Sequence, residues 1–218
     1  MAFNCGVSFG ACLVRITRVD ENGNVIAGDN SYVTDKPISI SVNANNEAGN
    51  SFSVRNGCGC GVARRKFPDT FNYWELTLQM ATLEPEMIAF MIGAATIDDG
   101  ADVVGVAFPS ALACDEQSPA VAFEFWAEHV VGSGLDATYP YFHWVFPSTS
   151  WVIADNTFEE GPAQPTLNGT SQTNGNWGDG PYGDGPPDGQ DISEGGFWAT
   201  ADALPEALCA AQAVTAVS

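Results

Sequence analysis

Residues 73–93 read YWELTLQMATLEPEMIAFMIG, and this stretch decides the fold that we expect. In its first half, apolar side chains alternate with more polar ones, which is the period-two pattern of a half-buried strand. The alternating apolar residues are Trp74, Leu76, Leu78 and Met80. The second half predicts a helix over about 84–92, so a strand leads directly into a short helix.

The two ends of this helix carry recognisable signals. Glu84 can accept bonds from backbone N–H groups, Pro85 suits the first helical position, and Gly93 suits the left-handed position that follows a helix. Between them, apolar residues recur at spacings of three and four, which predicts that one helix face packs into a core. These residues are Ile88, Met91 and Ile92.

The flanking sequence consists of short apolar or alternating runs separated by turn-forming residues, which predicts further strands. The turn DENGN (20–24) is expected to join two of them. The polar stretch NANNEAGN (43–50) is expected to be the tip of a hairpin whose returning strand is 51–55. The remaining expected strands cover 12–17, 25–26, 32–34, 38–42, 103–108, 120–126, 141–146 and 151–153. The chain is therefore predicted to be mainly β.

The last part of the chain has a different composition. The stretch NGNWGDGPYGDGPPDG (174–189) contains six glycines and three prolines, as a flexible linker does. Three aromatic residues could hold it in place, namely Trp177, Tyr182 and Trp198. The alanine-rich stretch 203–217 favours a short terminal helix. We expect a β domain over 1–165 and a Gly/Pro-rich extension over 166–218, packed on that domain or on a neighbouring subunit.

Charge is distributed unevenly along the chain, whose net charge is -20. Every lysine and arginine lies at or before Lys66, so the first 66 residues carry 7 − 5 = +2 and the remaining 218 − 66 = 152 residues carry -22. An acidic surface repels phosphate within about a Debye length, ~8 Å at physiological salt, which argues against tight DNA binding. The charge could serve solubility or reflect a host rich in salt, or it could keep the surface near a polyanion without binding it.

The start of the chain, MAFNCGVSFGACLVRITR, lacks the charged and apolar regions of a leader peptide. The chain also has no apolar run of the ~18 residues that a membrane helix needs. We therefore expect folding in the cytosol and no membrane association. In that reducing environment the six cysteines are expected to be small buried residues or free thiols.

The stretch NGCGCGVARRK (56–66) could carry chemistry of several kinds. A metal or redox site at Cys58 and Cys60 is weakened because Cys-x-Cys has neither a partner pair nor a strand-to-helix setting here. The alternating glycines favour a turn with positive φ angles. The triplet Arg64, Arg65 and Lys66 could bind phosphate, but pairing with acidic groups on the same chain or on a neighbouring copy suits this net charge better.

No other motif predicts catalysis. Asp20 begins a partial calcium-loop pattern in DENGN, which fails where a glycine is required, so a hairpin turn is favoured. His129 and His143 are expected to be packed residues. An acidic pair such as Glu124 and Glu128 arises by chance in a chain with 27 acidic residues. We expect no enzyme activity, no cofactor and no bound metal.

The order of these motifs resembles the major tail tube proteins of long, flexible-tailed phages, especially those that infect actinobacteria. The resemblance covers roughly residues 5–185, and its most specific parts are the strand-to-helix junction and the combination of YPYFHWVFP with NGNWGDGPYG. The matching pieces are CLVRITRVDENGNVI (12–26), YVTDKPISISVNANNEAGNSFSVRNG (32–57), YWELTLQMATLEPEMIAFMIG (73–93), AVAFEFW (120–126), YPYFHWVFP (139–147) and NGNWGDGPYG (174–183).

This resemblance implies a β-sandwich or barrel of two sheets with one flanking helix. It also implies a structural virion protein whose copies close into hexameric rings, which stack into a tail tube. DNA would pass through the tube without specific binding. The implied partners are further copies of the chain, the tape measure protein and the tail terminator. Assembly would take place in the host cytoplasm, and the protein would reside in the virion tail.

On this hypothesis the hairpin, the loop at 56–66 and the Gly-rich segment make the subunit contacts. The candidate contact residues are Asn45, Asn46, Glu47, Asn50, Arg55, Arg64, Arg65, Lys66, Trp177 and Tyr182. The alternative is a carbohydrate- or host-binding β-sandwich, that is, a decoration or receptor-binding virion protein. It is favoured by aromatic residues that we expect to be exposed at Trp151, Trp177, Tyr182 and Trp198.

Overall fold

The computed structural model describes residues 6–100, 102–108, 119–154, 164–178, 180–183 and 195–215. Over these residues the chain is mainly β, as predicted. Its elements are β1 (Val7–Arg18), β2 (Gly28–Thr34), β3 (Pro37–Glu47), β4 (Ser51–Arg55), β5 (Gly61–Lys66), β6 (Thr70–Met80), α1 (Pro85–Ile92), β7 (Ala95–Asp99), β8 (Asp102–Ala107), β9 (Val121–Val131), β10 (Gly134–Leu135), β11 (Tyr141–Ile153), β12 (Thr166–Ser171), β13 (Phe197–Ala201) and β14 (Ala211–Val214).

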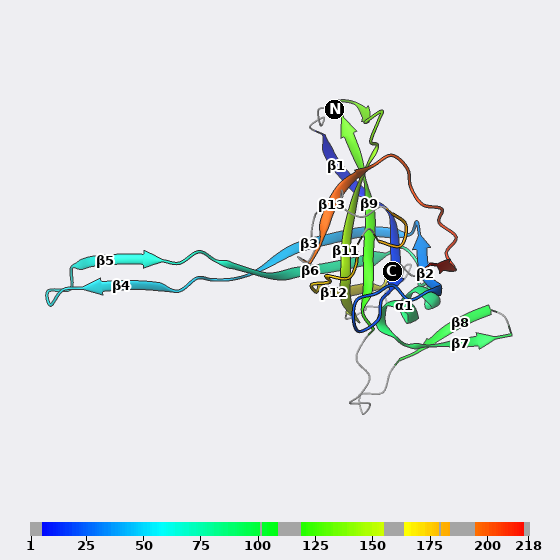
Figure 1. Cartoon of the computed structure of the whole chain (residues 1–218), viewed down its shortest axis with the longest axis horizontal. Coiled ribbons are helices and arrows are strands. Elements are labelled where there is room, and N and C mark those ends of the chain that lie inside the picture. Colours follow the sequence, from blue (N-terminus) through cyan, green and yellow to red (C-terminus); the bar gives the residue numbers. More distant parts are fainter. Residues whose placement is uncertain are drawn as a thin grey trace.

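The body is one antiparallel sheet in the order β14-β2-β1-β9-β11-β12-β6-β3, with β10 on β9 and β13 on β11. The sheet curves so strongly that β1 contacts β3, although the two are not neighbours in this order. The two expected layers are therefore parts of a single continuous sheet. Two hairpins, β4–β5 and β7–β8, form small separate sheets that project from the body (Figure 1).

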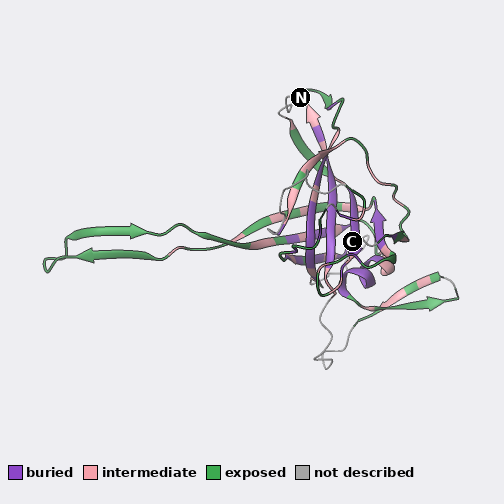
Figure 2. Cartoon of the chain, viewed as in Figure 1, coloured by how far each residue is buried: buried purple, intermediate pink, exposed green. Residues whose placement is uncertain are grey.

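The main core lies between the facing parts of the curved sheet and is closed by α1. Alternate residues of β6 point into it, as the period-two pattern predicted, and so does the helix stripe. Figure 2 shows the buried residues gathered in the central strands and the helix. The largest fully buried members include Leu76, Leu78, Met80, Met87, Met91, Phe123, Phe146 and Trp151.

The helix has the predicted bounds, but one of its end signals acts differently. Gly93 has φ 70°, and a Cβ there would lie 2.3 Å from Cδ of Pro119, so glycine is required twice over. The Glu84 side chain caps no helical N–H group. Its carboxylate instead accepts bonds from the hydroxyls of Tyr32 and Thr34 at 3.3 and 3.1 Å, and so ties the helix start to β2.

The expected hairpin tip at 43–50 is wrong. Residues 37–47 form β3, which pairs along its length with β6, and β4 then continues in the same direction away from the body. The chain turns at 56–60 and returns through β5, so 37–80 is one long hairpin. The Asn56 side chain fixes this turn, because its Oδ1 accepts bonds from the N–H groups of Cys58 and Cys60 at 3.2 and 2.8 Å. Gly59, with φ 80°, supplies the positive angle that the glycine pattern predicted.

The expected C-terminal helix is also wrong, for its described residues up to 215. Residues 203–208 have no regular structure and lie against the outer face of the sheet, where Leu204 and Ala207 pack on Leu13, Val33 and Trp126. The chain then enters β14, which pairs with β2. Sheet pairing and apolar contacts thus outweigh the helix propensity of alanine.

The expected division at residue 165 does not correspond to a break in the sheet. Strand β12, directly after it, lies between β11 and β6, and β13 pairs with β11. The described parts of the C-terminal extension therefore belong to the same body as the first 165 residues. They cover the outer face of the central strands, which explains why β9 is buried on both of its faces.

The Gly-rich segment is held in place over its described residues, 174–178 and 180–183. The side chain of Asn174 donates to the carbonyls of Gly23 and Pro147 at 2.9 and 3.0 Å, which links this segment to the turn at 20–24 and to β11. Trp177 is 2% exposed and packs in a second cluster with Val19, Val25, Ala122, Val145 and Val214. Trp177 is thus an anchor, as we predicted.

Candidate functional site

The most unusual surface is the distal part of the long hairpin, residues 50–72, which we call the arm. Every residue of the arm is exposed, and it extends away from the rest of the molecule (Figures 1 and 2). At roughly 3.3 Å per strand residue, the ten or so residues from its base to its tip span about 33 Å. None of the described parts of the body covers either face of β4–β5, which forms a sheet of its own.

The two faces of the arm differ in chemistry. Cross-strand pairing places Phe52 opposite Arg65 and Val54 opposite Ala63, so these four residues share one face. That face is mostly apolar. Its aromatic part continues into Phe67, whose ring lies edge-on to Phe52 at 6.0 Å between centroids and under the Arg65 guanidinium at 4.7 Å.

The opposite face is polar and basic. Ser51 pairs with Lys66 and Ser53 with Arg64, and Arg55 follows on the same side of β4. Residues 51–66 carry four of the seven lysines and arginines of the chain and no acidic residue. The net charge of this hairpin is therefore +4. Arg55, which was also among the predicted contact residues, thus lies on the same hairpin as the triplet. The rest of the chain carries 3 − 27 = −24.

The predicted contact residues at the base of the arm are mostly engaged in holding it together. Asn45 donates to Glu75 at 2.7 Å and accepts from Asn72 at 3.3 Å, while Asn46 and Glu47 pair with Phe71 and Thr70 in the β3–β6 ladder. The carbonyl of Asn50 accepts from the N–H of Phe67. Of these residues, Asn46, Glu47 and Asn50 keep exposed side chains.

The other predicted contact residues fall into two groups. Arg55, Arg64, Arg65 and Lys66 lie together on the exposed arm, as expected for a contact surface. Lys66 makes a salt bridge of 3.0 Å to Asp69, but both groups are exposed to solvent, which screens the pair and leaves it a weak contact. Trp177 is buried within its own chain and is unavailable to a neighbour, so this expectation is wrong.

Tyr182 lies partly exposed over a buried charge network that the sequence did not reveal. Its ring centroid is 3.7 Å from Cζ of Arg15, a cation–π contact. Arg15 binds Glu124 in a bidentate pair, with Nε to Oε1 at 2.8 Å and Nη2 to Oε2 at 2.5 Å. His143 Nε2 lies 2.9 Å from Oε2 of the same carboxylate, and its ring stacks on Trp126 at 4.1 Å.

This network joins the three central strands. Arg15 is on β1, Glu124 is directly opposite it on β9, and His143 is on β11. All three side chains are buried, with Glu124 at 0% exposure. Burial alone would raise the pKa of Glu124, but the charge of Arg15 and the bonds from His143 and Arg15 outweigh it and lower the pKa to about 2. The carboxylate is therefore ionised, and its role is to hold the strands together. His143 is a packed residue, as predicted, and so is His129, which is 1% exposed.

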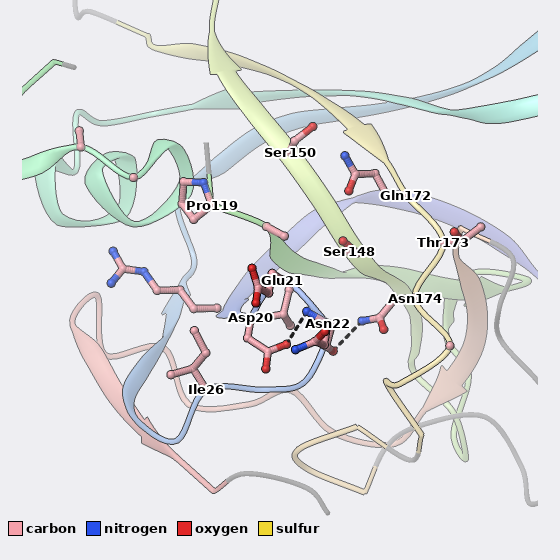
Figure 3. A pocket seen from close by; sticks show the side chains of 17 residues that line it. Asp20, Glu21, Asn22, Ile26, Pro119, Ser148, Ser150, Gln172, Thr173 and Asn174 are labelled. Atoms are coloured by element: carbon pink, nitrogen blue, oxygen red, sulfur yellow. Dashed lines mark hydrogen bonds between the residues drawn. The ribbon is translucent and has the colours of Figure 1, made fainter. Parts of the chain in front are cut away.

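A polar cleft of about 1020 Å³ opens beside the turn at 20–24 (Figure 3). Asp20 lies in that turn, where its Oδ1 accepts bonds from the N–H groups of Asn22 and Asn24 at 2.9 and 2.8 Å. Hydrogen bonds lower the pKa of Asp20, and those from Asn24 contribute more than those from Asn22. The hydrogen bonds of Asp20, together with the bridge between Val19 and Val25, confirm the predicted hairpin turn at 20–24. Arg18, also in the lining, lies over the ring of Phe90 at 4.1 Å, and among the described residues no histidine or cysteine lines the cleft.

The cysteines of the arm tip, Cys58 and Cys60, are exposed free thiols. Cys209 is also exposed and Cys12 is partly buried, so all four described cysteines are free thiols, as one of the two expectations had it. Cys5 and Cys114 lie outside the described residues. Within the described part of the chain, no three His, Cys, Asp or Glu side chains are grouped as metal ligands would be. No described helix is long and apolar enough to span a membrane.

The aromatic residues that favoured a carbohydrate-binding module are not all on the surface. Trp151 and Trp177 are buried, at 0% and 2% exposure. Tyr182 and Trp198 are partly exposed, but Tyr182 covers Arg15 and the Trp198 ring packs against Phe142 and Trp144. The support for that alternative is therefore weaker than the sequence suggested.

Comparison with known proteins adds no identity: the chain matches no protein-family model and no protein of curated function. The candidate functional site is the arm, because its exposed apolar and basic faces are suited to contact with a partner.

Proposed function

We propose that this protein is a structural subunit that assembles with copies of itself, through its arm, into the stacked rings of a phage tail tube. The observation that carries the proposal is the arm, a fully exposed two-stranded hairpin with one apolar and one basic face. An isolated two-stranded hairpin is at best marginally stable in water, and its open edges invite pairing with another chain. An arm of this kind gains its stability when a neighbour covers it.

The charge of the chain supports the same proposal. With -20 per copy, a hexameric ring would carry 6 × −20 = −120, and acidic groups around a central channel would keep phosphate from binding. DNA could then slide through such a channel without being held. The basic arm is the exception to this acidic surface and fits acidic groups on another copy.

Purified protein examined by negative-stain microscopy and sedimentation velocity tests the proposal. We expect rings or hollow tubes and a sedimenting species much larger than one chain of 23.0 kDa. A discrete monomer or trimer that binds sugars on a glycan array would instead support a carbohydrate-binding protein. A monomer at all concentrations and salt conditions would contradict self-assembly.

Removal of the arm charges should impair assembly. In the variant R64A/R65A/K66A, we expect the protein concentration needed for assembly to rise roughly 10-fold or more, because three charge contacts of about 0.5–1 kcal/mol each are lost. The melting temperature should change little, since these side chains contact no core residue. The measurement is sedimentation velocity over a concentration series.

The matched control for this variant is S51A/S53A, which alters exposed residues on the arm face that carries Arg64 and Lys66 without changing the charge. We expect it to assemble as the unmodified protein does. Unchanged assembly of the triple variant would mean that the arm charges do not take part in the contact.

A further inference from the structure

The hairpin β7–β8 is a second projecting sheet, and its charge is opposite to that of the arm. Asp98 and Asp99 lie at the end of β7, and Asp102 begins β8 opposite Asp99. All three aspartates are exposed, and residues 95–108 contain no lysine or arginine. The hairpin therefore carries three negative charges near its tip, whereas β4–β5 carries four positive ones.

Apolar side chains accompany the charges on both hairpins. On β7–β8, helix α1 covers one side of β8, while Ile97, Val104 and Phe108 remain 50%, 57% and 67% exposed. On the arm, Phe52 and Val54 are exposed to a similar degree. Exposed apolar groups beside charges of one sign are typical of a surface that a partner covers.

The two hairpins project from different sides of the body, the arm to the left and β7–β8 to the lower right in Figure 1. They therefore cannot meet within one molecule, but they can meet between two. In the described part of the chain, β4–β5 and β7–β8 are the only sheets separate from the body, and each has open strand edges. Such edges can pair through main-chain bonds while the side chains select the partner.

We infer that the basic arm of one copy docks on the acidic β7–β8 hairpin of the next copy. This inference rests on the proposed self-assembly and names the surface that receives the arm. A contact between two different patches is head-to-tail, so repetition of it closes a ring or extends a fibre, as its rotation dictates. All copies joined by this contact therefore point the same way around the ring or along the fibre.

Charge reversal tests this pairing. The variant R64E/R65E/K66E has an acidic arm and an acidic hairpin, and the variant D98K/D99K/D102K has a basic arm and a basic hairpin. We expect each variant alone to need at least a tenfold higher concentration for assembly than the unmodified protein. An equimolar mixture of the two should assemble again, because each arm then meets a hairpin of opposite charge. Sedimentation velocity and negative-stain microscopy measure both effects.

The matched control, E21K/D29K/D202K, makes the same change of net charge at exposed acidic residues outside the hairpin. We expect it to assemble without a partner variant. If D98K/D99K/D102K assembles normally, or if the mixture does not recover, the arm docks elsewhere, although self-assembly stands. If the unmodified protein never assembles, the proposed function itself fails. Circular dichroism spectra and melting temperatures of both variants show whether they are folded, and a folded pair that fails to recover on mixing overturns the inference.

Discussion

Replacing Glu124 with glutamine is expected to lower the free energy of unfolding by about 3–5 kcal/mol, the usual cost of breaking a buried ion pair. Glutamine keeps the size of the side chain but removes its charge. The Arg15 guanidinium would then be buried on β1 without its bidentate carboxylate. The loss should be large because the network also includes His143 and so joins three neighbouring strands.

Urea unfolding measures this effect, with Glu128→Gln as the matched control. Glu128 lies on the same strand but is only half-buried, so its replacement should change the free energy of unfolding by less than about 1 kcal/mol. The double variant R15M/E124L should be more stable than E124Q, because it removes both buried charges of the pair and not only that of the carboxylate. Equal stability of E124Q and the unmodified protein would mean that the network does not stabilise the fold.

The same carboxylate predicts a particular acid response. The pKa of Glu124 is about 2 in the folded chain, below its ordinary value of 4.5. Its contribution is therefore fully present above pH 4.5 and is lost as the pH falls toward 2, by about 3 kcal/mol in total. Urea unfolding of the unmodified protein and of E124Q, measured from pH 6 to pH 2, should show the stability difference narrowing below pH 4.5. A constant difference would contradict the pKa assignment.

Replacing Trp177 with alanine is expected to cost about 3–5 kcal/mol and to release the Gly-rich segment. This residue fills the second apolar cluster, which joins the turn region at Val19 and Val25 to β9, β11 and β14. Gly180 lies so close to the indole that a Cβ on it would be 3.0 Å from Nε1 of Trp177. Loss of the ring leaves a cavity beneath this segment.

Thermal unfolding and limited proteolysis measure the outcome. We expect new cleavage between 172 and 183 in W177A, because the segment loses its anchor. The matched control is Trp198→Ala, which removes the same ring at 51% exposure and should cost only about 1–2 kcal/mol. If both variants lose the same stability, burial of Trp177 is not what holds the segment.

The strand-to-helix stretch was predictable because local pattern and tertiary packing agree there. In 73–93, the period-two pattern, the proline and the glycine all favour the observed elements, and no distant contact alters them. The hairpin was harder to predict. Its distal strands pack on no core, and the polar stretch 43–50 has the composition of a turn although residues 43–47 belong to β3. The position of the tip depends on the bonds that Asn56 makes and on the angle of Gly59.

Two further differences have distinct physical causes. The alanine-rich end favours helix locally, but the edge of β2 offers hydrogen bonds, and burial of Val214 favours a strand. The network of Arg15, Glu124 and His143 was missed because its members are far apart in sequence. A signal was available, since Arg15 and Glu124 each interrupt an otherwise apolar run, and a charge in such a place needs a partner.

The four cations of the arm also decide which neighbours are rejected. Two arms placed edge to edge would bring 4 + 4 = 8 positive charges together in one small sheet, with no acidic residue in 51–66 to separate them. Like charges across strands disfavour pairing, and charged edge strands protect proteins from indiscriminate aggregation. A free copy thus resists forming a symmetric pair through its own arm. It can stay dispersed, with an exposed apolar face, until it meets a surface of the opposite sign.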